Sequence, residues 1–191
     1  MPANQLDFIR SYRTSDSGTL LGIAQSVPEQ LWKAALVTDE GILNRGIRQC
    51  GLWAISAHCQ TSPDLKFVDD VLFDIFGSAL RRYVLDLGEL GKFVSNAGIS
   101  EDEGYSFLRY LPGDFYILHT DNNTRKQPRT LSGILVLNDN YEGGELHFPL
   151  QDLILKPEAG TVILFPSSFT HPHQVKPVLS GVRYSVTTWF R

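Results

Sequence analysis

Short apolar runs separated by turn signals fill the chain from Tyr105 to Arg191, and they constrain its fold more than any other feature. The turn signals LPGD, NDNYEGG, PEAG and LSG stand between the runs. Many short strands divided by Gly and Pro are typical of an antiparallel sandwich or barrel. Eight candidate strands suit a jelly roll, and they are YSFLRYL, FYILH, TLSGILVLN, ELHFP, LILKP, TVILFP, HQVKPV and RYSVTTWF.

The part of the chain before Tyr105 carries helical signals instead. The segment SVPEQLWKAAL predicts a helix with Ser26 as its N-cap and Pro28 and Glu29 in its first turn. A longer helix is predicted over 67–87. Its expected core-facing residues are Phe67, Val71, Ile75, Leu80 and Val84. LWAISAH is predicted to be a strand, and the polar segment GELGKFVSNAGISEDEG is predicted to be a loop.

The length of 191 residues, 42% of them hydrophobic, is enough for one substantial core. We therefore expect a single α+β domain over 1–191. In this prediction 1–104 supply supporting helices and the first strands, while 105–191 form the jelly-roll core with the functional site.

The charge balance and cysteine content limit the classes of partner and compartment. There are 17 Lys and Arg against 21 Asp and Glu, a formal net charge of −4, so we expect neither nucleic acid nor a membrane as partner. Cys50 and Cys59 form no disulfide framework, and the N-terminus lacks the apolar stretch of a secretory signal. We expect a soluble, cytoplasmic protein, and no pattern indicates its oligomeric state.

His119 and Asp121 close an apolar run and, two residues apart in a strand, point to the same face. Alone, such a pair is more often structural than metal-binding. A third ligand is available in FTHPHQVKPV, which offers His171 and His173. Two imidazoles and one carboxylate on one side of a metal form the facial triad of non-haem Fe(II) oxygenases, which leaves positions open for cosubstrate and dioxygen.

Arg183 lies ten residues after His173, in a strand of Val, Tyr, Ser and Trp. A charge is costly to bury there without an anionic partner. Arg183 is therefore either a snorkelling or ion-paired structural residue, or a fork that clamps one carboxylate of a dicarboxylic acid. Strand alternation places Ser185, Thr187 and Trp189 on the same face. Thr187 could donate to that carboxylate, and Trp189 could line either the pocket or the core.

Three segments, taken in order, carry a resemblance to a known family: YLPGDFYILHTD, LSGILVLNDNYEGGELHFP and LKPEAGTVILFPSSFTHPHQVKPVLSGVRYSVTTWF. They resemble the 2-oxoglutarate- and Fe(II)-dependent dioxygenases of the prolyl 4-hydroxylase-like family. The resemblance covers the C-terminal 87 residues, Tyr105 to Arg191. It implies a double-stranded β-helix, another name for this jelly roll, with the N-terminal helices supporting its larger sheet.

The resemblance implies a role for each matching residue. His119 and Asp121 would be the first two iron ligands. His173 would be the third, because it stands in an H-x-V-x-P-V context ten residues before Arg183, the residue that would bind 2-oxoglutarate. His171 fits neither criterion, and it is either a cavity neighbour or a loop residue.

The same resemblance implies that Tyr110 lines the cosubstrate pocket. Some members of the family carry a tyrosine where this chain has Val136, so the far carboxylate of 2-oxoglutarate would rely on Arg183 with Thr187 or Tyr110. Tyr116 is either a pocket or a core residue.

The implied reaction is hydroxylation of an unactivated C–H bond. Fe(II) is the expected cofactor, 2-oxoglutarate and O2 the cosubstrates, succinate and carbon dioxide the products, and ascorbate a reductant. Related halogenases replace the carboxylate ligand by a small residue, so Asp121 favours hydroxylation. A prolyl residue in a peptide or protein is the leading substrate, and a free amino acid or small metabolite is the alternative.

Other features and functions stay open. His147 is expected to be a barrel-wall residue or substrate contact rather than a ligand, and His58 a structural residue. The segments 91–104 and NNTRKQPRT are expected to flank the mouth and set specificity. A nucleic-acid demethylase of the same superfamily would carry a second arginine where Trp189 stands, which disfavours that reading. A non-catalytic jelly-roll module and an oxygen or metal sensor are the remaining alternatives.

Overall fold

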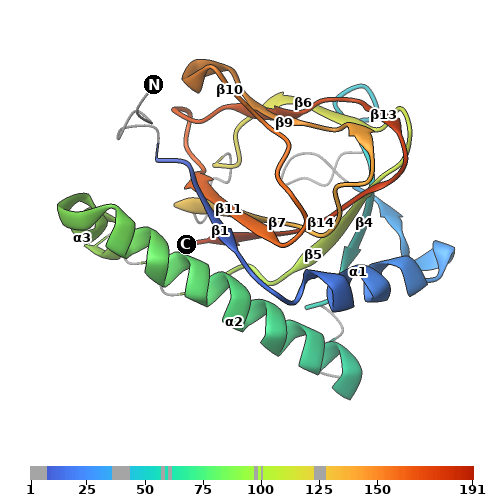
Figure 1. The fold of residues 1–191 in the computed structure, drawn as a ribbon, viewed down its shortest axis with the longest axis horizontal. Helices are drawn as coiled ribbons and strands as arrows, with labels where there is room; N and C mark the ends of the chain where they lie inside the picture. The colour runs from blue at the N-terminus through green and yellow to red at the C-terminus, as the bar shows by residue number, and fades with distance from the viewer. Residues whose placement is uncertain are drawn as a thin grey trace.

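The protein forms two facing antiparallel sheets in the computed structural model, which describes residues 8–35, 44–56, 59, 62–96, 99, 101–122 and 128–191 (Figure 1). The larger sheet has the strand order β1-β11-β7-β14-β5-β4-β2, and the smaller one β10-β9-β12-β6-β3. A separate two-stranded sheet joins β13 to β8. This is the α+β double-stranded β-helix that the sequence predicts.

All eight predicted strands of the C-terminal half are present. They are β5 (Ser106–Tyr110), β6 (Phe115–His119), β7 (Leu131–Val136), β9 (Leu146–Phe148), β10 (Leu153–Leu155), β11 (Thr161–Pro166), β12 (His173–Val175) with β13 (Val178–Ser180), and β14 (Arg183–Phe190). The predicted strand in LWAISAH is β4 (Gly51–Ala54). The strands that the sequence reading missed are β1 (Arg10–Arg13), β2 (Lys33–Ala34), β3 (Arg48–Gln49) and β8 (Glu142–Gly143). These are two to four residues long and form by pairing with longer strands rather than from a pattern of their own.

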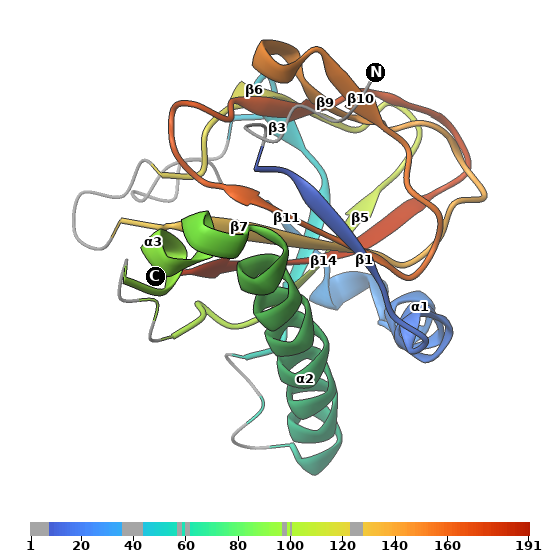
Figure 2. The ribbon, with the colours of Figure 1, turned by 60° about the vertical axis from the view of Figure 1, so that its left-hand side comes forward.

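The long helix α2 (Pro63–Asp86) lies across the outer face of the larger sheet (Figures 1 and 2). It begins at Pro63, four residues before the predicted start at 67, because the Ser62 hydroxyl caps the Leu65 amide and Pro63 occupies the first turn. The residues that it buries are Val68, Leu72, Ile75, Phe76, Ala79 and Tyr83. Within the sheet below, Gly133 leaves room for the helix, since a Cβ there would lie 2.9 Å from the Phe76 ring.

The predicted core face of this helix was partly wrong. Ile75 is buried as expected, but Phe67 is 64% exposed, and Val71, Leu80 and Val84 lie half-buried at the edges of the contact. The buried stripe is shifted by about one residue because the position of the sheet, not the helix's own pattern, decides which side chains are covered.

Two further predictions for the N-terminal half were wrong. Helix α1 (Ser17–Ser26) ends, rather than begins, at Ser26, whose hydroxyl donates to the Ile23 carbonyl. Only a 3-10 turn, η1 (Glu29–Leu31), follows before β2, because pairing with β4 takes the chain into the sheet. The predicted loop over 88–104 contains a second 3-10 turn, η2 (Gly88–Leu90), and the short helix α3 (Gly91–Asn96).

The hydrophobic core has two layers that share the larger sheet. One lies between that sheet and α2, around Phe76, Leu135 and Leu164. The other lies inside the barrel, around Tyr110 and Phe165. Among the described residues, no helix is both long enough and apolar enough to cross a membrane. The inner layer leads directly to the polar site.

Candidate metal and cosubstrate site

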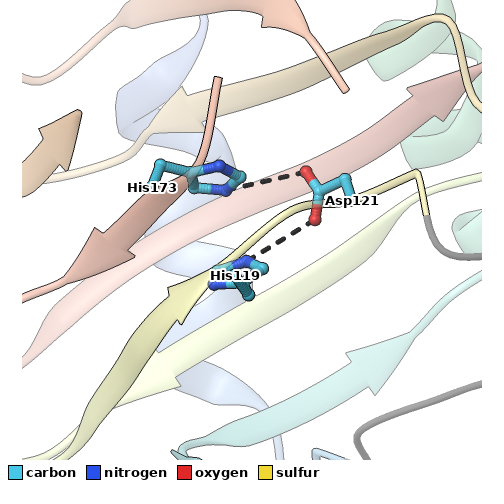
Figure 3. A group of neighbouring side chains, drawn as sticks. All are labelled: His119, Asp121 and His173. Carbon is cyan, nitrogen blue, oxygen red and sulfur yellow. Dashed lines mark ion pairs between the residues drawn. The ribbon is translucent and has the colours of Figure 1, made fainter. Parts of the chain in front are cut away.

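His119, Asp121 and His173 come together inside the barrel from two segments far apart in the sequence (Figure 3). The pairing of β12 with β6 sets His173 directly opposite His119, and Asp121 follows just after β6 ends. Nε2 of His119 lies 3.5 Å from one Asp121 carboxylate oxygen, and Nε2 of His173 lies 3.6 Å from the other. All three potential ligand atoms lie within 4.8 Å of one another.

Hydrogen bonds from the surrounding chain orient each of these side chains. Nδ1 of His119 donates to the Ile117 carbonyl at 2.8 Å, and Nδ1 of His173 donates to the His171 carbonyl at 3.2 Å. Because a carbonyl can only accept, these bonds place the proton on Nδ1 and leave each Nε2 with a free lone pair. Hydrogen bonds of this kind, made by the ring nitrogen that does not face the metal, fix the tautomer that a metal ligand needs.

The protonation states in the site also suit a cation. Burial lowers the pKa of His173 to about 4, with the neighbouring His119 acting in the same direction, so its imidazole is neutral at pH 7. Burial alone would raise the pKa of Asp121, but His173, His119 and a hydrogen bond from Ser132 hold it well below its usual range. The neutral His173 imidazole and the ionised Asp121 carboxylate are deprotonated donors of the kind that a divalent metal requires.

The other histidines lie outside this group of three. His171 is buried, and its Nδ1 is 2.9 Å from the Thr170 hydroxyl. His147 pairs with Gln174, with 2.7 Å between the amide nitrogen and Nδ1. Because the strand neighbours of both residues line the cavity, alternation points His147 and Gln174 away from it. His58 lies outside the described residues.

The cavity beside the triad extends along the inner face of β14. Its wall is made of Leu108, Tyr110, Tyr116, His119, Asp121, Ile134, Leu146, His173, Val175, Arg183, Ser185, Thr187 and Trp189. The predicted alternation along β14 is therefore correct, since Arg183, Ser185, Thr187 and Trp189 all face this one space. Of the remaining wall residues, Leu108, Ile134, Leu146 and Val175 are apolar.

Arg183 is a buried cation with unused hydrogen-bonding capacity. It is 2% exposed, its Nη1 donates to the Ser185 hydroxyl at 3.0 Å, and its Nε has no partner among the described residues. None of the carboxylates in the described part of the chain forms an ion pair with it. Close backbone approach gives it room, since a Cβ on Gly144 (φ +64°) would lie 3.1 Å from Arg183 Cδ. A buried guanidinium in this state is suited to an anionic ligand.

Tyr110 and Thr187, the other predicted cosubstrate contacts, also reach the cavity. The guanidinium of Arg183 lies 5.2 Å from the centre of the Tyr110 ring, and burial raises the pKa of the Tyr110 phenol well above its usual range. The Thr187 hydroxyl donates to the Gly133 carbonyl at 3.2 Å. Val136 is fully buried.

Tyr116, which the sequence left open as a pocket or core residue, lines the cavity and stacks on His119 with 3.5 Å between ring centres. The sequence reading did not single out Ser132, Ser167 and Arg48, which also shape the site. Ser132 donates to Asp121 at 2.6 Å and shares a 2.8 Å hydrogen bond with Ser167. Arg48 lies opposite Tyr116 in the pairing of β3 with β6, 4.6 Å from the centre of its ring. These contacts join different segments, so no spacing in the sequence signals them.

A jelly roll that holds two imidazoles, one carboxylate and a buried arginine in one cavity belongs to the class of facial-triad Fe(II) oxygenases. Comparison with known families agrees: residues 105–191 match the family model described as the 2OG-Fe(II) oxygenase superfamily. A PKHD-type hydroxylase of Shewanella baltica strain OS155 is 42% identical over 96 residues, which cover 44% of this chain and 41% of the relative. Human prolyl 3-hydroxylase 2 is 40% identical over 67 residues, 32% of this chain and 10% of that protein.

Solved structures share the fold over nearly the whole chain. A Pseudomonas putida prolyl-4-hydroxylase superposes with a TM-score of 0.69 at 22% identity, over 97% of this chain and 94% of the other. A Trichoplax adhaerens prolyl hydroxylase, in complex with a hypoxia inducible factor oxygen degradation domain peptide fragment, gives a TM-score of 0.70 at 23% identity, over 100% and 87%. At these identities the likeness shows the shared fold.

Residues 105–191 therefore match the 2OG-Fe(II) oxygenase superfamily, which confirms the predicted resemblance to 2-oxoglutarate- and Fe(II)-dependent dioxygenases. Prolyl 4-hydroxylases share the fold. The matched region spans about two fifths of the length of the PKHD-type relative, at 41%. The expected Fe(II), 2-oxoglutarate and O2 are confirmed by the family match and by a triad that fits iron, whereas ascorbate stays a prediction.

Proposed function

We propose that this chain is a Fe(II)- and 2-oxoglutarate-dependent dioxygenase that hydroxylates an unactivated C–H bond. One observation carries the proposal: a metal-binding triad and an unpaired buried Arg183 face the same cavity. A structural ion pair would account for the arginine only if a carboxylate of the chain approached it. None in the described part of the chain does, which supports an anionic ligand as the partner of Arg183.

In this proposal His119, Asp121 and His173 hold Fe(II) through two Nε2 atoms and one carboxylate. When bound, Fe(II) together with 2-oxoglutarate and O2 supplies the oxidising power for hydroxylation, with succinate and carbon dioxide as co-products. Asp121, kept ionised, adds the negative charge that a dication prefers. The presence of this carboxylate ligand supports hydroxylation over halogenation.

Arg183 would bind the far carboxylate of 2-oxoglutarate. Arg183 lines the cavity, its Nη1 donates to Ser185, and its Nε has no partner among the described residues. The guanidinium is therefore oriented before the cosubstrate arrives. Tyr110, beside the guanidinium, would supply a neutral hydroxyl to the same end of the cosubstrate. Thr187 is the less favoured contact, because its hydroxyl already donates to Gly133.

We propose a prolyl residue of a peptide or protein as the substrate. The support is the relatives: the curated ones are named hydroxylases and prolyl hydroxylases, and one structural neighbour is bound to a peptide fragment. A free amino acid or small metabolite is the second candidate, and a non-catalytic jelly-roll module the third. One domain over 1–191 and a cytoplasmic location are proposed with it, the latter from the low cysteine content. The exclusion of nucleic acid and membranes as partners remains a prediction from charge.

The test is succinate formation from 2-oxoglutarate in air, with and without added Fe(II), beside an Asp121→Ala variant. Turnover without prime substrate is expected to be slow but iron-dependent, and to vanish in the variant. Absence of succinate would be followed by titration of Fe(II) and 2-oxoglutarate without oxygen. Failure to bind either one would reject the dioxygenase and leave the binding module.

A further inference from the structure

Arg129 lies just before β7 and contacts three separate parts of the chain, two of which, Asp121 and Trp189, line the cavity. Its Nε and Nη2 donate to the two carboxylate oxygens of Glu103 at 2.8 and 2.6 Å. Its Nη1 donates to the main-chain carbonyl of Asp121 at 3.3 Å. Its guanidinium carbon lies 3.7 Å from the centre of the Trp189 ring. One side chain thus joins the segment before β5, a metal-ligand residue and a cavity-lining indole.

The Trp189 indole needs such a contact to hold its direction. Its Nε1 is buried and has no hydrogen-bond partner among the described residues. An unsatisfied buried donor costs about 1–3 kcal/mol, so a free indole would turn toward a partner. The guanidinium over its face opposes that turn, because a cation on an indole face adds ~0.5–2 kcal/mol. Since Trp189 lines the cavity with Asp121, its direction sets the shape of that wall.

The pairing with Glu103 explains how Arg129 can do this without disturbing the metal site electrostatically. The two side chains are 18% and 17% exposed, and they form a two-point ion pair, so the guanidinium charge is neutralised where it lies. Glu103 is itself anchored, because its amide donates to the Trp189 carbonyl at 2.9 Å. Arg129 therefore acts through position, in contrast to Arg183, whose charge has no such partner.

We propose that Arg129 is a positioning residue. Its ion pair with Glu103 holds it in place, and it fixes the Trp189 side chain and the main chain of Asp121 relative to each other. This inference rests on the proposed function, since it concerns the same cavity.

The test uses Arg129→Met beside a matched control, Arg109→Met. Arg109 makes a similar two-point pair with Glu29, at 2.7 and 2.6 Å, and lies 4.8 Å from the centre of the Trp32 ring. It lies outside the cavity wall. Three quantities are measured for each folded variant: the Kd for Co(II) alone, the rate of iron-dependent succinate formation, and Tm.

We expect Arg129→Met to bind Co(II) about 10-fold more weakly, which is a usual loss when a residue that supports a metal ligand, without touching the metal, is removed. Arg109→Met should match the unsubstituted protein in Co(II) affinity, even if its Tm falls. Arg129→Lys keeps the positive charge but loses the planar contact with Trp189. Its Kd for Co(II) should therefore lie between those of the unsubstituted protein and Arg129→Met. If Arg129→Met does not fold, Glu103→Gln provides a second test, because it removes the ion pair that holds Arg129. It should also weaken Co(II) binding.

Equal Co(II) affinity and equal succinate rate in the Arg129 and Arg109 variants would overturn the inference and leave Arg129 a stabilising residue only. The proposed function fails separately, through the absence of iron-dependent succinate in the unsubstituted protein. In that case the Co(II) affinities still decide whether Arg129 positions the triad.

Discussion

The hydroxyl of Ser132 donates to the Asp121 carboxylate at 2.6 Å, and this contact ties the central strand β7 to the metal-binding turn. Ser132 is fully buried and also shares a hydrogen bond with Ser167, whose carbonyl accepts from the Asp121 amide at 3.2 Å. Asp121 is thus held in place through both its carboxylate and its main-chain amide.

From this contact we predict that Ser132→Ala weakens Co(II) or Fe(II) binding by about 10-fold without unfolding the protein, because the carboxylate loses the donor that directs it. Isothermal titration with Co(II) measures the effect. Ser168→Ala is a suitable control, since that hydroxyl shares a hydrogen bond with Thr170 and Ser168 is not among the residues that line the cavity. Unchanged affinity in Ser132→Ala would mean that the backbone contacts alone direct Asp121.

The two neighbouring histidines of the β12 segment should behave differently. His173→Ala removes an Nε2 from the triad, so metal binding and iron-dependent succinate should fall by at least about 100-fold, in line with the loss of a direct ligand. His171→Ala should retain much of both, because its ring contacts Thr170 and only its carbonyl supports His173. The reverse ranking would overturn the ligand assignment.

Arg183→Met should weaken 2-oxoglutarate binding by about 10–100-fold, since hydrogen bonds to a charged group contribute about 1.5–3 kcal/mol. Titration of the metal-loaded protein with 2-oxoglutarate in the absence of oxygen gives the Kd. Thr187→Val is the companion variant, and we expect a change of only a few-fold because its hydroxyl is engaged with Gly133. A larger loss in Thr187→Val than in Arg183→Met would reverse the roles of the two residues.

The metal-free protein should lose stability as the pH falls from about 6.5 to 4. Burial lowers the pKa of His173 to about 4, below the 6.5 of a free imidazole. Between these values the unfolded chain takes up a proton that the folded chain does not, so acid favours unfolding. The full effect is at most about 3 kcal/mol. Urea denaturation at several pH values measures it, and the pH dependence in this window should flatten in His173→Gln.

The packing of α2 on the larger sheet depends on Phe76, which is fully buried, stacks on Tyr105 and lies over Gly133. We expect Phe76→Ala to reduce the free energy of unfolding by about 3–5 kcal/mol, through lost burial and the cavity left behind. Phe73 is on the same helix but 62% exposed, so Phe73→Ala should change stability by less than about 0.5 kcal/mol. Thermal or chemical denaturation compares the two, and similar losses would argue against the observed helix face.

The sequence alone determined those features that a strand's own geometry dictates. A two-residue period places Arg183, Ser185, Thr187 and Trp189 together along β14, whatever the rest of the chain does. Asp121 lies beyond the end of β6, so this period does not account for its position beside His119. Turn residues between apolar runs likewise delimited the strands of the C-terminal half. These are local properties, so reading them needs no knowledge of which strand lies beside which.

Tertiary structure alone decided the contacts between segments. The pairing of β12 with β6 brings His173 to His119, and β7 supplies Ser132 to Asp121, although nothing in either segment encodes its neighbour. The shifted core face of α2, and the 3-10 turn and strand β2 that replace the helix predicted after Ser26, have the same origin. Burial and pairing free energies from distant residues outweigh local preference by more than the few tenths of a kcal/mol per residue that separate most helix propensities.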